Sequence, residues 1–198
     1  MNDLTLTTCQ GQSITPYLEA LARLRHHALR DYPYLYDGDP GREADYLARY
    51  AECPQSLFVL AFDGETLVGA ATGMPLAADI DTLRAPFAQA QYRVEHIFFF
   101  GESLLMPDYR GRGIGTAFME AGEDHAFRQG FAIAVFRAVE REHDHPLTPA
   151  DYRPLNDFWH KRGYQRMPNL ATSCAWKDVN EAEPTHKPMA CWLKQLTS

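Results

Sequence analysis

The stretch "PDYRGRGIGTAF", residues 107–118, places three glycines and two arginines within six positions and then continues with apolar residues at helical spacing. The first N–H groups of a helix have no intrahelical partners and carry a partial positive charge. Glycines let an anion approach these groups, and arginines add charge-assisted hydrogen bonds. The stretch therefore predicts a phosphate site, more specifically a pyrophosphate site, at a helix start.

We expect the backbone N–H groups of Arg112 to Thr116 and the side chains of Arg110 and Arg112 to bind this pyrophosphate. A dinucleotide site is the competing interpretation, because "GRGIGT" matches part of the G-x-G-x-x-G pattern and Glu140 ends a later predicted strand. However, Thr116 replaces the third glycine, and "PDYR" stands where a dinucleotide loop would leave its strand directly. The P-loop pattern also fails, because no Gly-Lys-Ser/Thr follows.

Apolar and alternating runs predict the strands on either side of this helix. They cover residues 4–9, a hairpin at 56–74 about a "DGE" turn, a buried central strand at 94–106, and later strands at 131–139, 172–177 and 189–196. Helices are predicted from Thr15, with Pro16 at the first helical position, to about Arg30, and over 43–52, 114–130 and 155–163. Residues 31–41 and 140–154 have loop composition, and residues 82–91 are ambiguous.

Composition narrows the class of protein. With 198 residues, 45% of them hydrophobic, we expect a single domain over residues 1–198 with a loop insertion at about 140–154. A net charge of -7 without a lysine-rich run argues against nucleic acid, so we expect a small-molecule or peptide partner. Neither a signal-peptide pattern nor a membrane-spanning apolar run is present in the sequence, which favours a cytoplasmic protein without a membrane partner.

The four cysteines are scattered, without a C-x-x-C pair or zinc-ligand spacing, so we expect free thiols in a reducing compartment. They are Cys9, Cys53, Cys174 and Cys191. His143 and His145 in "EHDHP" could hold a metal, but this spacing in a polar loop is more typical of solvated side chains. We therefore expect no metal site.

The stretch "LLMPDYRGRGIGTAF", residues 104–118, resembles the acetyl-CoA-binding motif of the GNAT superfamily of N-acetyltransferases. The family signature Arg/Gln-x-x-Gly-x-Gly/Ala is met by Arg110, Gly113 and Gly115. The stretch "FWHKRGY", residues 158–164, is similar to the second motif of the family, Phe/Leu-Tyr-x-x-x-Gly-Phe/Tyr. The order of predicted strands and helices also agrees with that family along nearly the whole chain.

The resemblance implies an α/β (α+β) fold with a central, mostly antiparallel mixed sheet of about six to seven strands flanked by helices. It also implies an enzyme that transfers acetyl from the co-substrate acetyl-CoA to a primary amine by direct attack in a ternary complex. A non-catalytic acyl-CoA-binding sensor or regulatory domain is the alternative from another class. By motif position the donor would be held by Leu104, Leu105, Met106, Arg110, Gly111, Arg112, Gly113, Ile114, Gly115 and Thr116, with the backbones of the first three beside the thioester carbonyl.

The usual general acid of the family is the tyrosine of the second motif, but this chain has Trp159 there. Tyr152 stands where the family commonly has an asparagine. Since an indole cannot deliver the proton and a phenol can, we predict Tyr152 or Tyr164 as the acid, with His160 as a further substitute.

Three ionisable residues, Glu95, His96 and Glu102, interrupt the apolar run of the central strand. A carboxylate buried there would need a partner or a raised pKa, and either would suit a base. Glu102 is nearest to the place where the family's strands separate, so it is the first candidate for the general base. A solvent-facing residue at a strand end that frays at Gly101 is the other interpretation of Glu102.

In the resembling family the loop between the first two helices lines the acceptor site. Here that loop, "DYPYLYDGDP", alternates acidic and aromatic residues, a combination that suits a cationic amine. We predict acceptor contacts from Tyr32, Tyr34, Tyr36 and Asp37, although these tyrosines could instead brace a surface loop. Trp176 and Trp192 in the closing strands are compatible with either a core or a homodimer interface.

Overall fold

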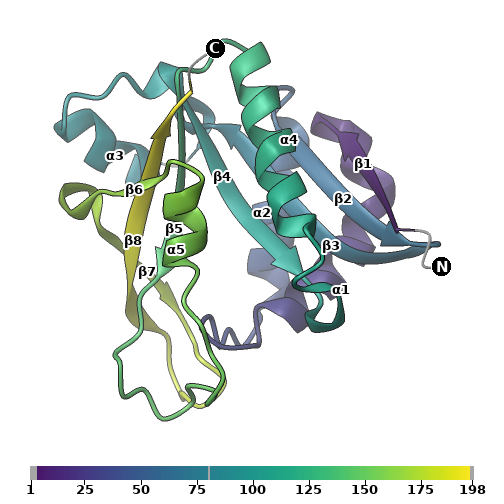
Figure 1. The fold of residues 1–198 in the computed structure, drawn as a ribbon, viewed down its shortest axis with the longest axis vertical. Helices are drawn as coiled ribbons and strands as arrows, with labels where there is room; N and C mark the ends of the chain where they lie inside the picture. Colours follow the sequence, from purple (N-terminus) through teal and green to yellow (C-terminus); the bar gives the residue numbers. More distant parts are fainter. Residues whose placement is uncertain (1–3, 80, 197–198) are drawn as a thin grey trace.

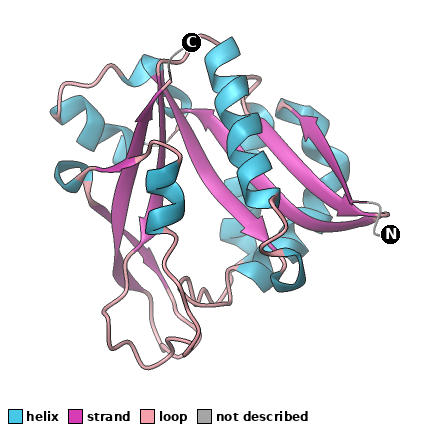
Figure 2. Cartoon of the chain, viewed as in Figure 1, coloured by secondary structure: helices cyan, strands magenta, loops and turns pink. Residues whose placement is uncertain are grey.

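The computed structural model describes residues 4–79 and 81–196, which form one eight-stranded sheet with helices on both faces (Figures 1 and 2). The strand order is β1-β2-β3-β4-β5-β8-β6, and β7 also pairs with β8. Among the described residues β4 and β5 run parallel, and all other pairings are antiparallel. The strands are β1 (Leu4–Cys9), β2 (Leu57–Asp63), β3 (Thr66–Pro75), β4 (Ile97–Leu105), β5 (Ile133–Val139), β6 (Gln165–Arg166), β7 (Thr172–Trp176) and β8 (Thr185–Gln195).

The predicted mixed, mostly antiparallel sheet is thus confirmed. The additional strand is β6, whose two residues are too short to produce a periodic sequence signal. The helices are α1 (Leu18–Ala28), α2 (Pro40–Glu52), α3 (Asp81–Gln89), α4 (Ile114–Arg128) and α5 (Asn156–Lys161), and short 3-10 helices span Gly11–Tyr17, Leu76–Ala78, Val94–His96, Pro107–Tyr109 and Pro168–Leu170.

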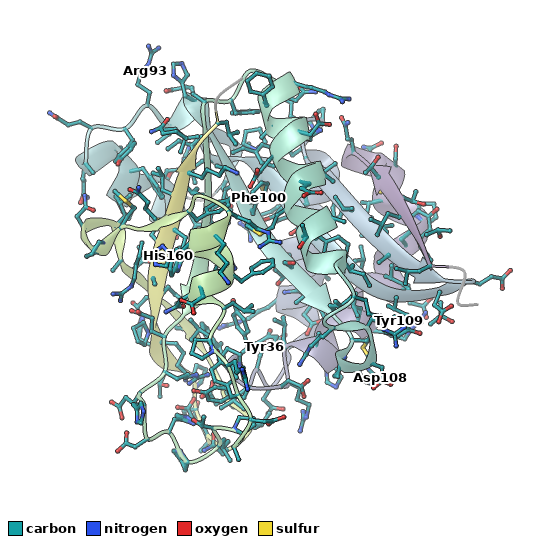
Figure 3. All side chains as sticks on the ribbon, viewed as in Figure 1. Tyr36, Arg93, Phe100, Asp108, Tyr109 and His160 are labelled. Atoms are coloured by element: carbon teal, nitrogen blue, oxygen red, sulfur yellow. The ribbon has the colours of Figure 1, made fainter. Side chains whose placement is uncertain are left out.

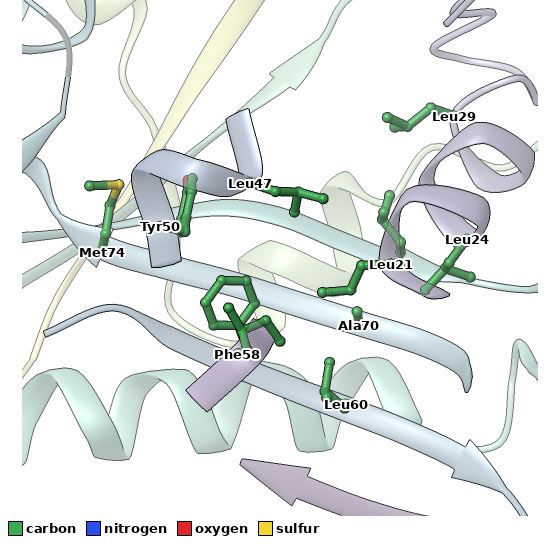
Figure 4. Close-up of a cluster of buried hydrophobic side chains, with 11 residues drawn as sticks. Leu21, Leu24, Leu29, Leu47, Tyr50, Phe58, Leu60, Ala70 and Met74 are labelled. Atoms are coloured by element: carbon green, nitrogen blue, oxygen red, sulfur yellow. The ribbon is translucent and has the colours of Figure 1, made fainter. Parts of the chain in front are cut away.

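The side chains of β2 point alternately to the two faces of the sheet, and both faces are covered by helices. Phe58 and Leu60 pack in a cluster with α1 and α2, which Figure 4 shows in close-up. Val59 and Ala61 point to the other face and pack in a cluster with Phe118 of α4. Both faces of the central strands are therefore buried, which explains their nearly continuous apolar composition.

The N-terminal helix begins differently from the prediction. A 3-10 helix spans Gly11–Tyr17 with Pro16 inside it, and α1 follows at Leu18. The Thr15 hydroxyl donates to Gln12 O at 2.6 Å and does not cap a helix. The chain turns earlier because Gly11 adopts a φ of 50°, a left-handed conformation that favours glycine, directly after β1.

The second helix also starts earlier than predicted, at Pro40 and not at residue 43. Asp39 Oδ1 accepts hydrogen bonds from the N–H groups of Gly41 and Arg42 at 2.9 and 3.2 Å. An aspartate cap followed by proline at the first helical position is a strong start signal, but it lay inside a segment with loop composition.

The central strand is shorter than predicted, because residues 94–96 form a 3-10 turn before β4. Between Phe100 and Glu102 the pairing with β3 shifts by one residue, so Gly101 is the extra residue of a β-bulge. A Cβ on Gly101 would lie 1.9 Å from Tyr50 Oη and 2.5 Å from Tyr46 Oη. A glycine is therefore needed where β4 bends beneath α2.

Trp176 and Trp192 are both buried within this chain, with 8% and 1% of their surface exposed. Trp192 packs with Tyr164 and Ala134 in a small cluster on the α5 side of the sheet. Both tryptophans are therefore core residues of this chain. None of the helices within residues 4–79 and 81–196 combines the length and apolar character needed to cross a bilayer.

Candidate functional site: a cleft between two strands

The parallel strands β4 and β5 pair only at their beginnings, through residues 97–100 and 133–136. Beyond these residues β4 continues along β3 and β5 continues along β8, so the two halves of the sheet separate (Figure 1). A cleft of about 1230 Å³ occupies this gap. Its lining extends from the start of α4 to the loop between α1 and α2, and we call these two ends the donor end and the acceptor end after the sites that the sequence predicts there.

The edge of β4 that faces the gap has no partner strand beyond Phe100. Met106 N–H donates to Val68 O of β3 at 2.9 Å. Because N–H directions alternate along a strand, Leu104 also faces β3, whereas Ser103 and Leu105 face the gap. Of the three predicted donor backbones, Leu105 is the one directed into the cleft, and Ser103 accompanies it.

The glycine-rich turn precedes α4 as predicted and is open. Gly111 and Gly113 have φ angles of 73° and 83°, and a Cβ on either would come within 4 Å of no atom of the described residues beyond its own chain neighbours. Gly113 is also the N-cap of α4, and no side chain within the described residues caps this helix. The N–H groups of residues 114–116 are therefore available to a ligand.

Two arginines approach this turn. Arg110 lines the cleft, with its Nε 3.3 Å from Leu105 O and its Nη2 3.4 Å from Asp31 Oδ2. Arg162, at the end of α5, donates to Thr116 Oγ1 and stacks on the Phe158 ring at 3.7 Å. The donor end thus combines oriented backbone N–H groups with positive charge from two segments of the chain.

Other predicted donor residues lie elsewhere. Arg112 stacks over the ring of Tyr109, which Figure 3 labels beside the start of α4, and does not line the cleft. The Ile114 side chain is buried in the core beneath α4. The predicted residues that do line the cleft are Leu104, Leu105, Arg110, Gly111, Gly113, Gly115 and Thr116.

Glu102 lines the cleft and is held by an ion pair. Arg25 Nε and Nη2 each donate to one of its carboxylate oxygens at 2.8 Å. Burial opposes the charge of Arg25, but the Glu102 carboxylate more than offsets this, so the pKa of Arg25 lies above its ordinary value. The Glu102 side chain is 14% exposed. It is therefore not a solvent-facing residue at a frayed strand end.

A second carboxylate lies on the other side of Arg25. Glu43 Oε2 is 3.9 Å from Arg25 Nη1, and burial raises the pKa of Glu43. The Glu102 backbone N–H donates to Thr72 Oγ1 at 3.1 Å, and this hydroxyl also bonds Tyr46 Oη at 3.1 Å. The network joins α1, α2, β3 and β4, so it fixes the position of Glu102 in the cleft wall.

The loop between α1 and α2 contributes part of its predicted set. Tyr32 and Tyr34 line the cleft, and burial raises the pKa of Tyr34 to about 12. Tyr36 instead forms a β-bridge with Asp178 outside the cleft. The Asp37 carboxylate is 2.7 Å from the Lys177 ammonium, also outside the cleft. Two of the four predicted acceptor residues are therefore in the cleft.

A buried arginine anchors this loop. Arg141 donates from Nε to Pro33 O at 2.6 Å and from Nη2 to Tyr34 O at 2.7 Å. Its Nη1 and Nη2 also donate to the two carboxylate oxygens of Asp178, at 2.6 and 3.0 Å. Arg141 thus satisfies two loop carbonyls and one buried carboxylate, and it fixes the tyrosines that line the cleft.

The predicted acids have different environments. Tyr152 lines the cleft with its ring 4.6 Å edge-on from Tyr32, and burial raises the pKa of Tyr152. Tyr164 is buried in the core and does not line the cleft, and burial raises its pKa as well. Trp159 lines the cleft, whereas the exposed His160, labelled in Figure 3, does not. Of the three candidates, Tyr152 is the one placed where a substrate could reach it.

The sequence profile of the acetyltransferase (GNAT) family matches residues 21–149 of this chain. The chain belongs to this family. The match contains the glycine-rich turn, β4, β5 and the acceptor loop, which together form most of the cleft wall.

Solved structures show that the GNAT fold extends over the whole chain. A ribosomal-protein-alanine N-acetyltransferase from Brucella melitensis is 11% identical, with a TM-score of 0.62 over 96% of this chain and 99% of that one. A protein from Salmonella typhimurium, solved with its cofactor acetyl-CoA, is 14% identical, with a TM-score of 0.60 over 100% of this chain and 96% of that one. No curated protein sequence matches this chain.

Several polar cleft residues of this GNAT protein were not singled out from the sequence, among them Arg137, Asn156 and Arg162. Arg137 interrupts the apolar run "FAIAVFRAV", the same kind of signal that marked Glu102 and could have identified it. The two α5 residues had no comparable signal, because their approach to α4 is a tertiary contact. Within the described residues, no three His, Cys, Asp or Glu side chains are grouped to hold a metal ion.

Proposed function

We propose that this GNAT protein transfers an acetyl group from acetyl-CoA to a primary amine by direct attack in a ternary complex. The observation that carries the proposal is the continuity of the cleft, which joins the open glycine turn to the tyrosine-lined acceptor end across the gap between β4 and β5. Two reactants can therefore meet at one strand edge, which removes much of the entropic barrier of a bimolecular reaction. In this proposal residues 1–198 act as one domain, as the single sheet from β1 to β8 supports.

The donor end fits the pyrophosphate of CoA. The turn at Gly111 and Gly113 is open where a Cβ would stand, and the first N–H groups of α4 are uncapped by any described side chain. Arg110 and Arg162 add positive charge. When bound, acetyl-CoA would supply the activated acetyl group, and one of the two cleft-facing N–H groups, that of Ser103 or that of Leu105, would donate to the carbonyl oxygen as charge develops on it.

The remaining chemistry concerns protons. An ammonium acceptor must lose a proton before attack, and we propose that Glu102 accepts it, directly or through water. The amine nitrogen then forms a bond to the acetyl carbon as the carbon–sulfur bond breaks. Tyr152 is our candidate to donate its hydroxyl proton to the departing sulfur, and the second amine proton, lost as the amide forms, restores the tyrosine. None of the four cysteines, all in the described part of the chain, lines the cleft, which supports transfer without a cysteine-bound intermediate.

Thermal unfolding with CoA, acetyl-CoA or NADH tests the donor site. A ligand at a hundred times its Kd stabilises by about 2.7 kcal/mol, which corresponds to a rise in Tm of roughly 5 to 11 °C for a domain of this size. We expect the rise with CoA and acetyl-CoA and none with NADH. Thiol release in the presence of primary amines then tests transfer. A rise in Tm without release for any amine would favour the acyl-CoA sensor over the enzyme.

A further inference from the structure

Arg137 is an arginine of the cleft that has no carboxylate partner in the described residues. It lies on β5 and lines the cleft beyond the point where β4 and β5 separate. Its Nη1 donates to Thr172 Oγ1 at 2.9 Å, and its guanidinium lies 5.8 Å from the centre of the Phe99 ring. Its Nε is buried and has no hydrogen-bond partner in residues 4–79 and 81–196. No carboxylate of those residues lies within 4 Å of it.

The side of the sheet on which Arg137 lies is the acceptor side. Its neighbours on β5 with the same orientation, Ile133 and Val135, pack with α3, on the face opposite to α4 and α5. The phosphate-binding turn belongs to α4, so the donor phosphates are expected on the other face. Arg137 therefore faces the acceptor.

The two walls of the acceptor end carry opposite charges. On the β4 wall, Arg25 stands between two carboxylates, Glu102 and Glu43, so this cluster has an excess of negative charge. On the β5 wall, Arg137 supplies one uncompensated positive charge. Tyr34 lines the cleft together with Glu102 and Arg137, and its pKa is raised by burial and by Glu102 and lowered by Arg137.

We propose that the acceptor is a small amine that also carries a carboxylate, as an amino acid does, and that Arg137 binds this carboxylate while the ammonium group faces Glu102. The proposal rests on the acetyl-transfer function proposed above. One guanidinium matches one carboxylate in charge and in its forked geometry. A bound carboxylate would supply the counter-charge that Arg137 lacks among the described residues, which would favour carboxylate-bearing amines over otherwise similar ones.

The test compares matched acceptors. Amino acids and their carboxamides, together with tryptophan and tryptamine, are assayed for thiol release with acetyl-CoA and the full-length protein. We expect kcat/KM to be about 10- to 100-fold higher for the carboxylate member of the preferred pair. We expect Arg137→Gln to remove that preference through a higher KM for the carboxylate member, with the carboxamide nearly unaffected.

Three further variants control for folding and for general charge. Arg137→Lys should retain part of the preference, because it keeps the positive charge without the fork. Thr172→Val removes the existing partner of Arg137 and should keep the preference. Arg128→Gln changes an exposed arginine of α4 that does not line the cleft and should change nothing.

Equal turnover of carboxylates and carboxamides by the unaltered protein would overturn the carboxylate site alone. An unchanged preference in Arg137→Gln would do the same. Turnover with neither class, despite a rise in Tm with acetyl-CoA, would instead overturn the proposed acetyl transfer, and the carboxylate site with it. The two failures are therefore distinguishable.

Discussion

The two ends of the cleft are built in different ways. The backbone of the donor end comes from one continuous stretch, residues 110–116, in which glycines expose N–H groups at the start of α4, and Arg162 adds charge from beyond α5. The acceptor end takes side chains from α1, β4, β5 and two loops, and it compensates most of their charges in pairs such as Arg25–Glu102 and Arg141–Asp178. A backbone site needs correct local geometry, whereas a side-chain site needs the whole fold to bring partners together.

The largest expected effect is at the donor end. Gly113→Glu should abolish the rise in Tm with CoA, because a carboxylate in the turn repels the pyrophosphate and fills its place. Gly130→Glu is the matched control, since Gly130 has a φ of 86° and equally open surroundings, but lies after the other end of α4. In both variants a glutamate replaces a glycine that has a positive φ, so the backbone strain and the added negative charge are the same. Retained CoA binding by Gly113→Glu would contradict our placement of the pyrophosphate.

At the acceptor end, Glu102→Gln should lower kcat by about 100-fold or more, because the amide cannot accept the ammonium proton. The rise in Tm with CoA should be unchanged, which would show that the two ends act separately. Glu95→Gln serves as control, because Glu95 is an exposed carboxylate just before β4. A kcat close to that of the unaltered protein would exclude Glu102 as the base.

Arg141→Met tests whether the acceptor loop depends on its buried anchor. Removing the guanidinium takes a hydrogen-bond donor from the Pro33 and Tyr34 carbonyls and the ion-pair partner from the Asp178 carboxylate. We expect the free energy of unfolding to fall by about 3 kcal/mol, the lower end of the usual cost of breaking a buried ion pair, because Lys187 also lies 3.5 Å from Asp178. Denaturant unfolding measures this loss. We expect KM for the amine to rise about tenfold with unchanged CoA affinity. If CoA affinity fell by the same factor, the loop would not be specific to the acceptor end.

The smallest expected effect concerns the stability of the donor helix in acid. Burial lowers the pKa of His125 on α4 from its ordinary value of 6.5, partly offset by its contact with Gln55 O. The unfolded chain therefore binds this proton more readily than the folded chain, so stability falls as pH drops below about 6.5. His125→Gln should flatten the dependence of Tm on pH in this range, and the exposed His143→Gln should not. Equal slopes for all three proteins would contradict this assignment.

Particular residues show where sequence interpretation reached its limit. The hairpin of β2 and β3, the glycine turn and α4 were predicted because their signals are local. Asp39 and Pro40 carried a helix-start signal that loop composition obscured. Tyr164 was a chemically reasonable acid, and only its position in the core removes it from the cleft. Residue type alone does not tell whether a polar side chain lines a cleft or is buried behind it.

The sequence by itself determined the family resemblance and the donor end, because left-handed glycines and uncapped N–H groups are properties of consecutive residues. Tertiary structure decided the acceptor end. Glu102 meets Arg25 from 77 residues away, and Arg141 reaches Tyr34 from 107 residues away. These contacts depend on how helices and strands pack, so the sequence identified Glu102 and Tyr34 as candidates but gave no indication that Arg137 would lack a counter-charge in the same cleft.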